Sequence, residues 1–449
     1  MKGAQFVVSH GGTVNKVHIG LGYLNSLAPW NGRGGFALQP IRELLARLGD
    51  PQESLPLLHI AGTNGKGSVS AALASILGQS GYRVGLNTSP HLEDLNERVV
   101  VDGWPVGDEV LGELAYDLRA AAHKGGDQIS FHEAITALSF LCFRELKVEW
   151  GVVEVGLGGR LDASNVISRP AATAIVTIDY DHQHILGNSL AEIAAEKAGI
   201  IKPGSPLISG RLPSEALTVV RRMAKNVAHR QLGLDYDVRK IEGQERRFEY
   251  WNKFSPSGAN ITFEFESPLI GIHQGHNMAV AAAVALEVGL TPEACKQGIE
   301  ASFWPGRLEQ CDVAGRSLVL DAAHNPAGIK AFVSFLRARN ASDIDLTFGA
   351  LDTKNWESML AQLLPFVKTI RLLQPESDRA LPEERIVQYV TASGNDIKII
   401  RYGLDYEGCV RELLADSGAP PAYVTGSMYM LGRLRKMLSL PKRPLWARA

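Results

Sequence analysis

The sequence predicts an α/β fold of two domains, a larger N-terminal domain with a mostly parallel sheet and a smaller C-terminal α/β domain. Three observations lead to this prediction. The chain has 449 residues, and a single hydrophobic core rarely grows beyond about 250–300 residues. Strand-like and helix-like segments alternate in both halves, which is typical of parallel, doubly wound sheets. A glycine-rich turn joins the first apolar strand to a helix at residues 62–68.

The N-terminal domain consists of short apolar runs that alternate with segments of helical period. The expected strands are Leu55–Ala61, Arg83–Asn87, Gly151–Val155 and Ala174–Ile178. The expected helices are Ser68–Gly78, Phe131–Leu146, Leu190–Ile200, with Ser189 as its N-cap, and Gly275–Gly289. The polar and aromatic stretch Tyr236–Glu266 is expected to form antiparallel strands outside the parallel set.

A second alternating pattern follows the segment Phe303–Leu308, where Pro305 and Gly306 indicate a linker. We therefore place the domain boundary so that the domains span residues 1–305 and 306–449. The expected strands and helices of the second domain are, in order, Ser317–Leu320, Pro326–Arg339, Asp345–Phe348, Trp356–Leu364, Thr369–Leu373 and Ala422–Thr425.

Composition argues against several classes of protein. The formal net charge of −2 provides no positive field for nucleic acid. The most apolar segments are far shorter than the roughly 20 residues of a membrane span, and the N-terminus does not resemble a signal peptide. Four widely spaced cysteines indicate reduced, mostly buried thiols and a cytoplasmic protein. The basic clusters Arg221–Arg222 and Arg433–Lys436 are expected to lie on solvated helix faces.

The segment His59–Ser68 (HIAGTNGKGS) is a candidate phosphate-binding loop. Backbone N–H groups of such a turn, with the helix N-terminus, form an anion site, and Lys66 can reach the β- and γ-phosphates of a nucleotide. The loop is shorter than the strict Walker pattern, and its hydroxyl is displaced to Ser68. A plain strand–helix turn is the alternative. A lysine at a helix start argues against it, because the helix dipole disfavours a cation there unless an anion binds.

Two further segments place polar groups at strand ends. Thr88–Val99 (TSPHLEDLNERV) carries Ser89, whose hydroxyl can ligate magnesium, although a structural Ser-Pro turn is the alternative. Glu154 lies in an apolar strand, and a lone buried carboxylate is costly unless it is paired or binds a metal. The glycines in Glu154–Ile167 (EVGLGGRLDASNVI) do not lead into a suitable helix, so dinucleotide binding is not predicted.

Acidic and imidazole side chains cluster in Thr177–Gly204, directly after the fourth strand. The cluster can serve a metal, and a zinc site is an alternative that lacks supporting cysteines; its members are Asp179, Asp181, His182 and His184. Lys197 on the next helix could simply complement the helix C-terminus. In the second domain, DAAHNPAG (321–328) places Asp321 and His324 where they can face a nucleotide across the domain cleft, while Asn325 before Pro326 is typical of a helix start.

Taken together and in this order, these segments resemble the folylpolyglutamate synthase/dihydrofolate synthase family, a branch of the Mur ligase superfamily. Further matching segments are HNMAVAAAVAL (276–286), WPGRLE (304–309), FGALDTKN (348–355) and TGSMYMLG (425–432). The resemblance extends from about Gly20 to Arg435. It implies a P-loop-type ATPase domain followed by a smaller, Rossmann-like glutamate-ligase domain.

The resemblance implies an ATP-dependent ligase that forms C–N bonds. ATP would phosphorylate a carboxylate of dihydropteroate or of a reduced folate, and L-glutamate would attack the acyl phosphate, with release of ADP and phosphate. The alternatives are an enzyme with one of these two activities, a cell-wall Mur ligase, which needs a further N-terminal domain, and a nucleotide-gated binding protein. We expect a monomer with small-molecule substrates and neither nucleic acid nor membrane as a partner.

The resemblance also assigns residues. It implies ATP contacts at Thr63, Asn64, Gly65, Lys66, Gly67, Ser68, Asn277, Arg307 and Asp321. It implies magnesium ligands at Ser89, Glu154 and His182. It implies a pteroate pocket at Ser130, Phe131, His132, Glu133, Leu161, Asp162 and Ala163. The expected catalytic residues are Lys66, Lys197 and His324. Lys197 matches a lysine that is carbamylated in the superfamily, and a monovalent cation is a further candidate cofactor beside ATP and Mg²⁺.

Overall fold

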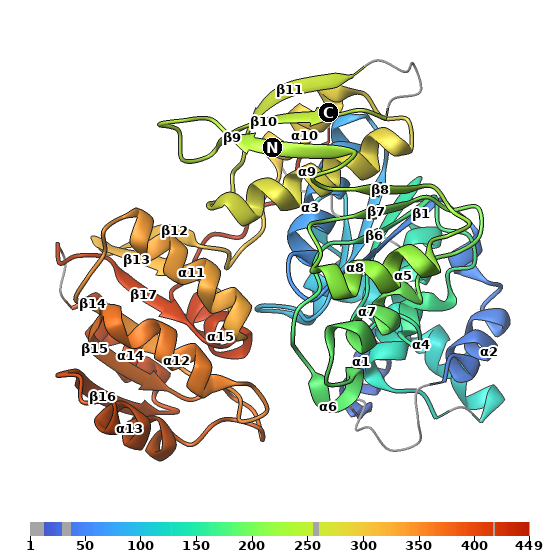
Figure 1. The fold of residues 1–449 in the computed structure, drawn as a ribbon. Coiled ribbons are helices and arrows are strands. Elements are labelled where there is room, and N and C mark those ends of the chain that lie inside the picture. The colour runs from blue at the N-terminus through green and yellow to red at the C-terminus, as the bar shows by residue number, and fades with distance from the viewer. Residues whose placement is uncertain (1–12, 29–36, 127, 255–259, 416–417, 449) are drawn as a thin grey trace.

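Two sheet-based lobes lie side by side in the computed structural model, and a small third sheet packs on the first lobe (Figure 1). The structure describes residues 13–28, 37–126, 128–254, 260–415 and 418–448. These residues form sheets of eight, three and six strands. The predicted α/β class, with a large mostly parallel sheet and a second sheet domain, is confirmed.

The eight-stranded sheet of the first lobe has the order β4-β3-β2-β5-β1-β6-β7-β8, and the strands from β2 across to β8 are parallel. The chain moves to one side of β1 for β2 and β5 and to the other side for β6. Ligands of such sheets bind where the order reverses, at the carboxyl end of β1. The strands are β1 Leu57–Ala61, β2 Val84–Asn87, β3 Val99–Val101, β4 Trp104–Pro105, β5 Trp150–Glu154, β6 Ala172–Ile175, β7 Leu207–Ser209 and β8 His229–Gln231.

Helices cover both faces of this sheet because its central strands are apolar on both sides. Leu58 and Ile60 pack into one core with α3, α9 and α10, whereas the adjacent Leu57 packs into another core with α2, α4 and α5. This alternation is the two-residue period of a strand. The helices of the lobe are α1 Thr13–Ser26, α2 Gln39–Arg47, α3 Lys66–Gln79, α4 Asp108–Gly125, α5 Phe131–Glu145, α6 Gln183–Leu186, α7 Leu190–Ala198, α8 Ser214–Met223, α9 Ile272–Glu287 and α10 Pro292–Ala301.

The polar and aromatic stretch after β8 forms the small sheet, as predicted. Its strands β9 Tyr236–Lys240, β10 Arg247–Asn252 and β11 Ile261–Glu266 are antiparallel. Tyr236, Phe248 and Tyr250 on one face are buried in the core that also contains α3 and α9. The small sheet therefore packs against α9 and α10 (Figure 1).

The second lobe has one six-stranded sheet in the order β12-β13-β17-β14-β15-β16, in which only β12 pairs antiparallel. Its strands are β12 Glu309–Val313, β13 Arg316–Leu320, β14 Ile344–Phe348, β15 Val367–Leu373, β16 Lys398–Gly403 and β17 Ala422–Thr425. Its helices are α11 Pro326–Ala338, α12 Trp356–Leu363, α13 Glu383–Ala392, α14 Tyr406–Leu414 and α15 Met428–Met437. Asn325 caps α11 by accepting from the Gly328 N–H at 2.8 Å, as its position before Pro326 predicts.

The chain crosses between the lobes twice. Residues 302–308, which contain neither helix nor strand, lead into β12, and the C-terminal residues return to the first lobe. The Phe303 N–H donates to the Leu445 carbonyl at 2.7 Å, and the Leu445 N–H donates to the Gly103 carbonyl at 2.8 Å. Trp446 is fully buried in the core of the first lobe. These contacts tie the C-terminus to the lobe in which the chain begins.

Three sequence-based expectations were wrong in detail. The strand expected at Ala174–Ile178 ends at Ile175, because the next residues leave the sheet to hydrogen-bond the glycine-rich turn. Helix α9 begins at Ile272, three residues before the expected start. Arg435 does not lie on a solvated face: it is 4% exposed and forms ion pairs with Glu93 and Glu309.

Candidate functional site

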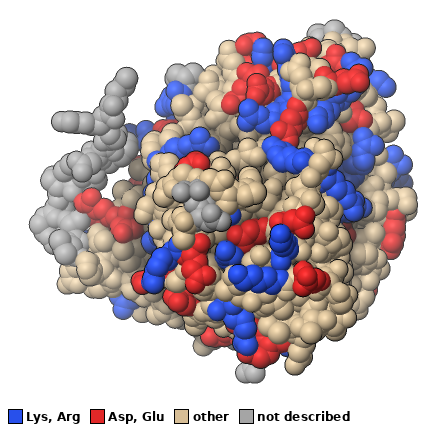
Figure 2. Space-filling view, turned by 90° about the vertical axis from the view of Figure 1, so that its left-hand side faces the viewer, with Lys and Arg blue, Asp and Glu red and all other residues tan. Residues whose placement is uncertain are grey.

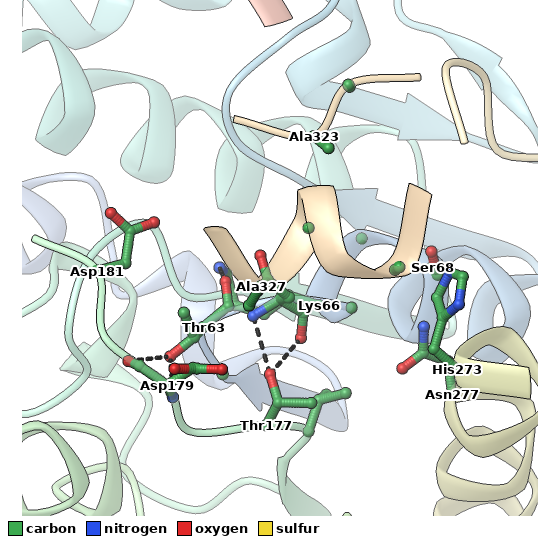
Figure 3. A pocket seen from close by; sticks show the side chains of 18 of the residues that line it. Thr63, Lys66, Ser68, Thr177, Asp179, Asp181, His273, Asn277, Ala323 and Ala327 are labelled. Carbon is green, nitrogen blue, oxygen red and sulfur yellow. Dashed lines mark hydrogen bonds between the residues drawn. The ribbon is translucent and has the colours of Figure 1, made fainter. Parts of the chain in front are cut away.

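A cavity of about 360 Å³ lies where the carboxyl ends of β1, β5 and β6 face the second lobe. Figure 3 shows its interior, with the turn after β1, the loop after β6 and the first turn of α9 around it. The predicted nucleotide, magnesium and catalytic residues all line this cavity: Thr63, Asn64, Gly65, Lys66, Gly67, Ser68, Ser89, Glu154, His182, Lys197, Asn277, Arg307, Asp321 and His324. Residues scattered over more than 250 positions of the sequence therefore share one site.

The glycine-rich turn is held in shape by the loop that leaves β6. The Thr63 N–H donates to the Thr177 carbonyl at 2.8 Å, and the Asn64 N–H donates to the Thr177 hydroxyl at 2.9 Å. Thr63 Oγ1 donates to the Asp179 carbonyl at 3.2 Å (Figure 3). Gly65 has φ = 83°, in the left-handed region that favours glycine. These bonds fix the loop that opens α3, whose N-terminus is a favourable place for phosphate.

The loop departs from the Walker pattern for a steric reason. A Cβ atom at Gly67 would lie 2.7 Å from the ring of Trp304, so the serine or threonine of the longer pattern does not fit there. The hydroxyl of the next residue, Ser68, is buried and has no hydrogen-bond partner within the described ranges. An unpartnered buried hydroxyl in a phosphate-loop geometry is suited to a polar ligand in the cavity.

Lys66 and Glu154 face each other across the cavity, with Lys66 Nζ 3.9 Å from Glu154 Oε1. Glu154 is 5% exposed, and burial raises its pKa to about 7, although the charge of Lys66 acts in the opposite direction. Lys66 Nζ also lies 3.4 Å from the Thr63 carbonyl. The pair thus places one cation and one buried carboxyl group at the start of α3.

Lys197 is the second lysine of the site and lies in the last turn of α7. It is 4% exposed, and its Nζ donates to the Gly62 carbonyl at 3.0 Å. Burial lowers the pKa of Lys197 to about 7, and the charge of Lys66 contributes in the same direction. The side chain therefore points into the cavity instead of complementing a helix end in solvent. Near pH 7, a substantial fraction of the protein molecules carries Lys197 as a neutral amine.

The three predicted magnesium ligands line the same cavity, but one of them has a competing partner. Ser89 precedes the cis Ser89-Pro90 bond at the end of β2, and Glu154 ends β5. His182 has a pKa lowered to about 4 by burial and by Lys354, so its ring is neutral. Its Nε2 atom lies 3.4 Å from Lys354 Nζ, so ligation through this nitrogen requires Lys354 to move away.

Clusters of His, Cys, Asp and Glu side chains that could hold a metal by themselves are absent from the part of the chain that the structure describes. No group of three or more His, Cys, Asp or Glu side chains is arranged there to hold a metal ion. The acids and imidazoles at residues 179–184 therefore do not form the zinc site considered from the sequence. All four cysteines are free, and three of them are buried.

The second lobe contributes polar groups that the sequence analysis did not assign to the site. Asn325 Nδ2 donates to Asn64 Oδ1 and to Asp181 Oδ2, both at 3.0 Å. Lys354 Nζ lies 2.7 Å from Asp181 Oδ1, and both side chains are about 10% exposed. Asn325 was interpreted only as a helix start, and Lys354 only as part of a matching segment. Their distance of more than 140 residues from Asp181 in the sequence leaves no local signal for these contacts.

Asp321 and His324 reach the cavity from the loop after β13. The Asp321 carboxylate accepts from the backbone N–H groups of Leu308 and Ala323 at 2.9 and 3.0 Å. His324 Nδ1 lies 3.0 Å from the Ala322 carbonyl. Because a carbonyl oxygen only accepts, Nδ1 carries the proton, and Nε2 of the neutral ring is an acceptor. Burial lowers the pKa of His324 to about 4, which keeps this ring neutral.

The residues predicted to line the pteroate pocket lie behind the lining of the cavity, where Asp162 Oδ2 accepts from the N–H of the lining residue Leu157 at 2.8 Å. Ser130, Phe131, His132 and Glu133 are at the start of α5, and Leu161, Asp162 and Ala163 are in the loop after β5; none of them lines the cavity. His132 Nε2 lies 3.1 Å from Asp162 Oδ2, so the two segments contact each other. Ser130 and Glu133 form a capping box, which is a structural role. Burial alone would raise the pKa of Asp162, but His132 and Ser164 hold it well below its usual range.

The surface shows no segregation of charge on the face drawn in Figure 2. Acidic and basic side chains are interspersed there. None of the helices in the described ranges has both the length and the apolar composition needed to cross a bilayer.

Comparison with known proteins places this chain among folate enzymes. Residues 60–285 match the family model "Mur ligase middle domain". The chain is 34% identical to folylpolyglutamate synthase of Lacticaseibacillus casei, over 89% of this chain and 93% of that protein. It is 32% identical to dihydrofolate synthase/folylpolyglutamate synthase of Bacillus subtilis, over 91% and 97% of the two chains.

Solved structures give the same result for the fold. A crystal structure of folylpolyglutamate synthase from Thermotoga maritima superposes with a TM-score of 0.80 at 30% identity and covers 96% of this chain and 98% of that one. Mycobacterium tuberculosis folylpolyglutamate synthase complexed with ADP has a TM-score of 0.80 at 27% identity, over 96% and 100% of the two chains. The chain therefore belongs to the folylpolyglutamate synthase/dihydrofolate synthase family of ligases, a family built on the Mur ligase middle domain.

Proposed function

We propose that this protein is an ATP-dependent amide ligase that adds L-glutamate to dihydropteroate, to a reduced folate, or to both. The observation that carries the proposal is the shared cavity. In it, a phosphate loop with Lys66 faces the buried Glu154, and the second lobe adds Asp321 and His324. The relatives named above include an enzyme with both activities, dihydrofolate synthase/folylpolyglutamate synthase.

The turn after β1 is proposed to hold the ATP phosphates through residues 63–68. Support comes from the left-handed Gly65, the unpartnered Ser68 hydroxyl and the ammonium group of Lys66 at the start of α3. Asn277 from α9, with Arg307 and Asp321 from beyond the linker, is assigned to the rest of the nucleotide. Arg307 and Asp321 interact electrostatically, so both are held at the edge of the cavity.

A magnesium ion fits the donor groups of this cavity. Glu154 is a buried carboxyl group whose pKa is raised to about 7 by burial, which is unfavourable for its charged form unless a further cation is present. Mg²⁺ prefers oxygen ligands and keeps water or phosphate in its remaining positions, so Ser89 and Glu154 would hold it, with His182 as a third ligand. When bound, Mg²⁺ would neutralise charge on the transferring phosphoryl group.

The proposed reaction has two steps. A carboxylate oxygen of the acceptor attacks the γ-phosphorus, an O–P bond forms, the bond to the β-phosphate oxygen breaks, and ADP leaves. Lys66 is placed to stabilise the negative charge on the transferring group. The neutral amino group of L-glutamate then attacks the acyl carbon, a C–N bond forms and inorganic phosphate leaves. The two lobes must meet around both steps, because water would hydrolyse the acyl phosphate.

Two further residues, His324 and Lys197, are given roles in this reaction. His324 offers Nε2 as a neutral hydrogen-bond acceptor on the side of the cavity that the second lobe covers, so it is proposed to orient the amino group of L-glutamate, whose proton leaves to solvent. Lys197 is proposed to react with CO₂ to form a carbamate. Its buried amine has a pKa lowered to about 7, and a neutral amine is the form that attacks CO₂. A carbamate would supply a further anion for a cation in the cavity.

The proposal also covers the acceptor segments, the domain boundary and the state of the enzyme in solution. Residues 130–133 and 161–163 are proposed to bind the pteroate group, because the His132–Asp162 contact joins them into one surface. We propose the domain boundary at residue 306, since β12 begins at Glu309. We also propose a monomeric, cytoplasmic enzyme, since the four free thiols suit a reducing compartment. A monovalent cation is a further candidate cofactor.

The test is ADP release by the purified protein with ATP, Mg²⁺ and L-glutamate, in the presence of either dihydropteroate or tetrahydrofolate. Turnover that requires both glutamate and an acceptor is expected. The ratio of the two rates distinguishes a bifunctional enzyme from one with a single activity. ATP hydrolysis that is independent of both would contradict the proposal and would indicate a nucleotide-gated binding protein.

A further inference from the structure

Arg98 occupies a rigid position near Glu154 and the start of α5. It ends the short 3-10 helix η2, Leu95–Arg98, which follows β2. Its carbonyl accepts from Asn87 Nδ2 at 3.0 Å and from the Thr88 N–H at 3.3 Å. The carboxylate of the preceding Glu97 accepts three backbone N–H groups of the same loop at 2.7–3.0 Å. The backbone that carries the guanidinium group is therefore fixed from both sides.

The guanidinium group of Arg98 has no anionic partner within the described parts of the chain. Its Nε donates to His91 Nδ1 at 2.9 Å, and its Cζ lies 5.2 Å from the centre of the Phe131 ring. Among the described residues, no carboxylate oxygen lies within 4.0 Å of it, and its side chain donates no second hydrogen bond. The buried Arg435, in contrast, pairs with two carboxylates. A half-buried cation that forms no ion pair is unfavourable. This indicates that a ligand supplies the anion that pairs with Arg98.

The surroundings of Arg98 identify the chemistry of that ligand. Arg98 interacts electrostatically with Tyr429, Glu154 and Glu97 without an ion pair to any of them, and Glu154 faces Lys66. On its other side lies Phe131, in the segment proposed to bind the pteroate group. The free Nη1 and Nη2 groups form a planar fork that matches a carboxylate. The acceptor of the proposed reaction has to present a carboxylate between these same two places.

We propose that Arg98 binds the acceptor carboxylate that becomes phosphorylated and holds it toward the γ-phosphate. This inference rests on the proposed function and adds the residue that orients the attacking group. Arg98 transfers no proton and forms no bond: a carboxylate oxygen displaces ADP from phosphorus, and the guanidinium group stays charged throughout. The reacting group is the benzoate carboxylate in dihydropteroate and a glutamate carboxylate in a reduced folate, and Arg98 is assigned to whichever of them faces the γ-phosphate.

The test compares Arg98→Gln and Arg98→Lys with the wild type, with Arg169→Gln as a matched control at an exposed arginine. The KM for the acceptor is expected to rise about 10- to 100-fold in Arg98→Gln, as expected for losing a charge-assisted hydrogen bond. The KM for ATP should stay within about twofold. Arg98→Lys should recover part of the loss, since it restores the charge without the fork. Arg169→Gln should behave as the wild type.

A second measurement separates binding of the carboxylate from a structural role of Arg98. An acceptor analogue in which the reacting carboxylate is a primary carboxamide is tested as a competitive inhibitor, beside the acceptor itself. The wild type should prefer the carboxylate by about 10-fold or more, and Arg98→Gln should bind both about equally. An unchanged preference in Arg98→Gln would overturn the inference, even while glutamate-dependent turnover of the wild type upheld the proposed function.

Discussion

Lys354 Nζ, from the second lobe, lies 2.7 Å from Asp181 Oδ1, in the loop after β6 of the first lobe. Asn325 binds the other oxygen of the same carboxylate and also binds Asn64 in the phosphate loop. Closure of the two lobes is thereby linked to the shape of the phosphate loop through one carboxylate. A contact between the lobes is thus formed by Lys354, Asp181 and Asn325. Any ATP-dependent movement of one lobe relative to the other has to keep or break it.

The interdomain pair should show energetic coupling in a double-mutant cycle. Lys354→Met leaves the buried Asp181 carboxylate without its nearest cation, so glutamate-dependent kcat/KM should fall by roughly 10-fold or more. Asp181→Asn should cost a similar factor, and the double variant should cost less than the product of the two, with a coupling of about 1–3 kcal/mol. Lys330→Met, at an exposed lysine of α11, is the control. Additive effects would show that the pair does not act as a unit.

Removal of the charge of Lys66 should stop phosphoryl transfer. Lys66→Ala removes the ammonium group that faces Glu154 at 3.9 Å and that is proposed to stabilise the γ-phosphoryl group. A fall in kcat of about 10²–10³ is expected, as for loss of other groups that stabilise transition-state charge. Lys225→Ala changes an exposed lysine of the same lobe and should leave kcat unchanged. A near-normal rate for Lys66→Ala would remove this lysine from the mechanism.

Carbamylation of Lys197 can be observed without an activity assay. With a pKa of about 7, the buried amine is largely neutral at pH 8, so it can attack CO₂ and release one proton. In ¹³C-bicarbonate, the NMR spectrum of the wild type should contain a carbamate carbonyl signal. This signal should be absent from Lys197→Arg and present in Lys202→Arg, a control at another lysine whose pKa burial lowers. A spectrum that does not depend on Lys197 would argue for an unmodified amine.

Two arginines of α15 should differ sharply in their effect on stability. Arg435 is buried and pairs with the largely buried Glu93 and Glu309, so Arg435→Ala removes the cation from both carboxylates, and a loss of about 3–5 kcal/mol in the free energy of unfolding is expected. Arg433 pairs with Glu376 at 3.5 Å, and both side chains are about half exposed. Arg433→Ala should therefore cost less than about 1 kcal/mol. Denaturant unfolding of both variants measures the difference, and equal losses would contradict this assignment.

His59 should contribute to instability in acid. It is fully buried, and burial lowers its pKa from 6.5 to about 4. The unfolded chain therefore binds a proton that the folded chain does not between pH 6.5 and pH 4, so stability is complete above pH 6.5 and is lost as the pH falls toward 4. For this group the loss is roughly 3 kcal/mol. Between pH 6.5 and pH 4, the free energy of unfolding should fall by about 3 kcal/mol less in His59→Gln than in His18→Gln, a control at an exposed histidine.

The acceptor end of the site rests on resemblance alone. Residues 130–133 and 161–163 were assigned only by resemblance, and they lie outside the cavity that holds the other predicted site residues. Ser130 and Glu133 are explained locally, because they form a capping box at the start of α5. Arg98 lies within the segment Thr88–Val99, but nothing in the sequence distinguishes an unpaired arginine from a paired one.

The sequence by itself determined the α/β class, the central strands and helices of both lobes, the glycine-rich turn and the polar groups at the strand ends, because these follow from local hydrophobic period and turn chemistry. Only the tertiary structure decided the rest. It brought Asp181 to Lys354 and Asn325, it placed Trp304 against Gly67, so that the loop hydroxyl belongs to Ser68, and it buried Arg435. Each of these is a contact between residues more than 100 positions apart, whose geometry depends on how distant elements pack together. No local pattern encodes that packing.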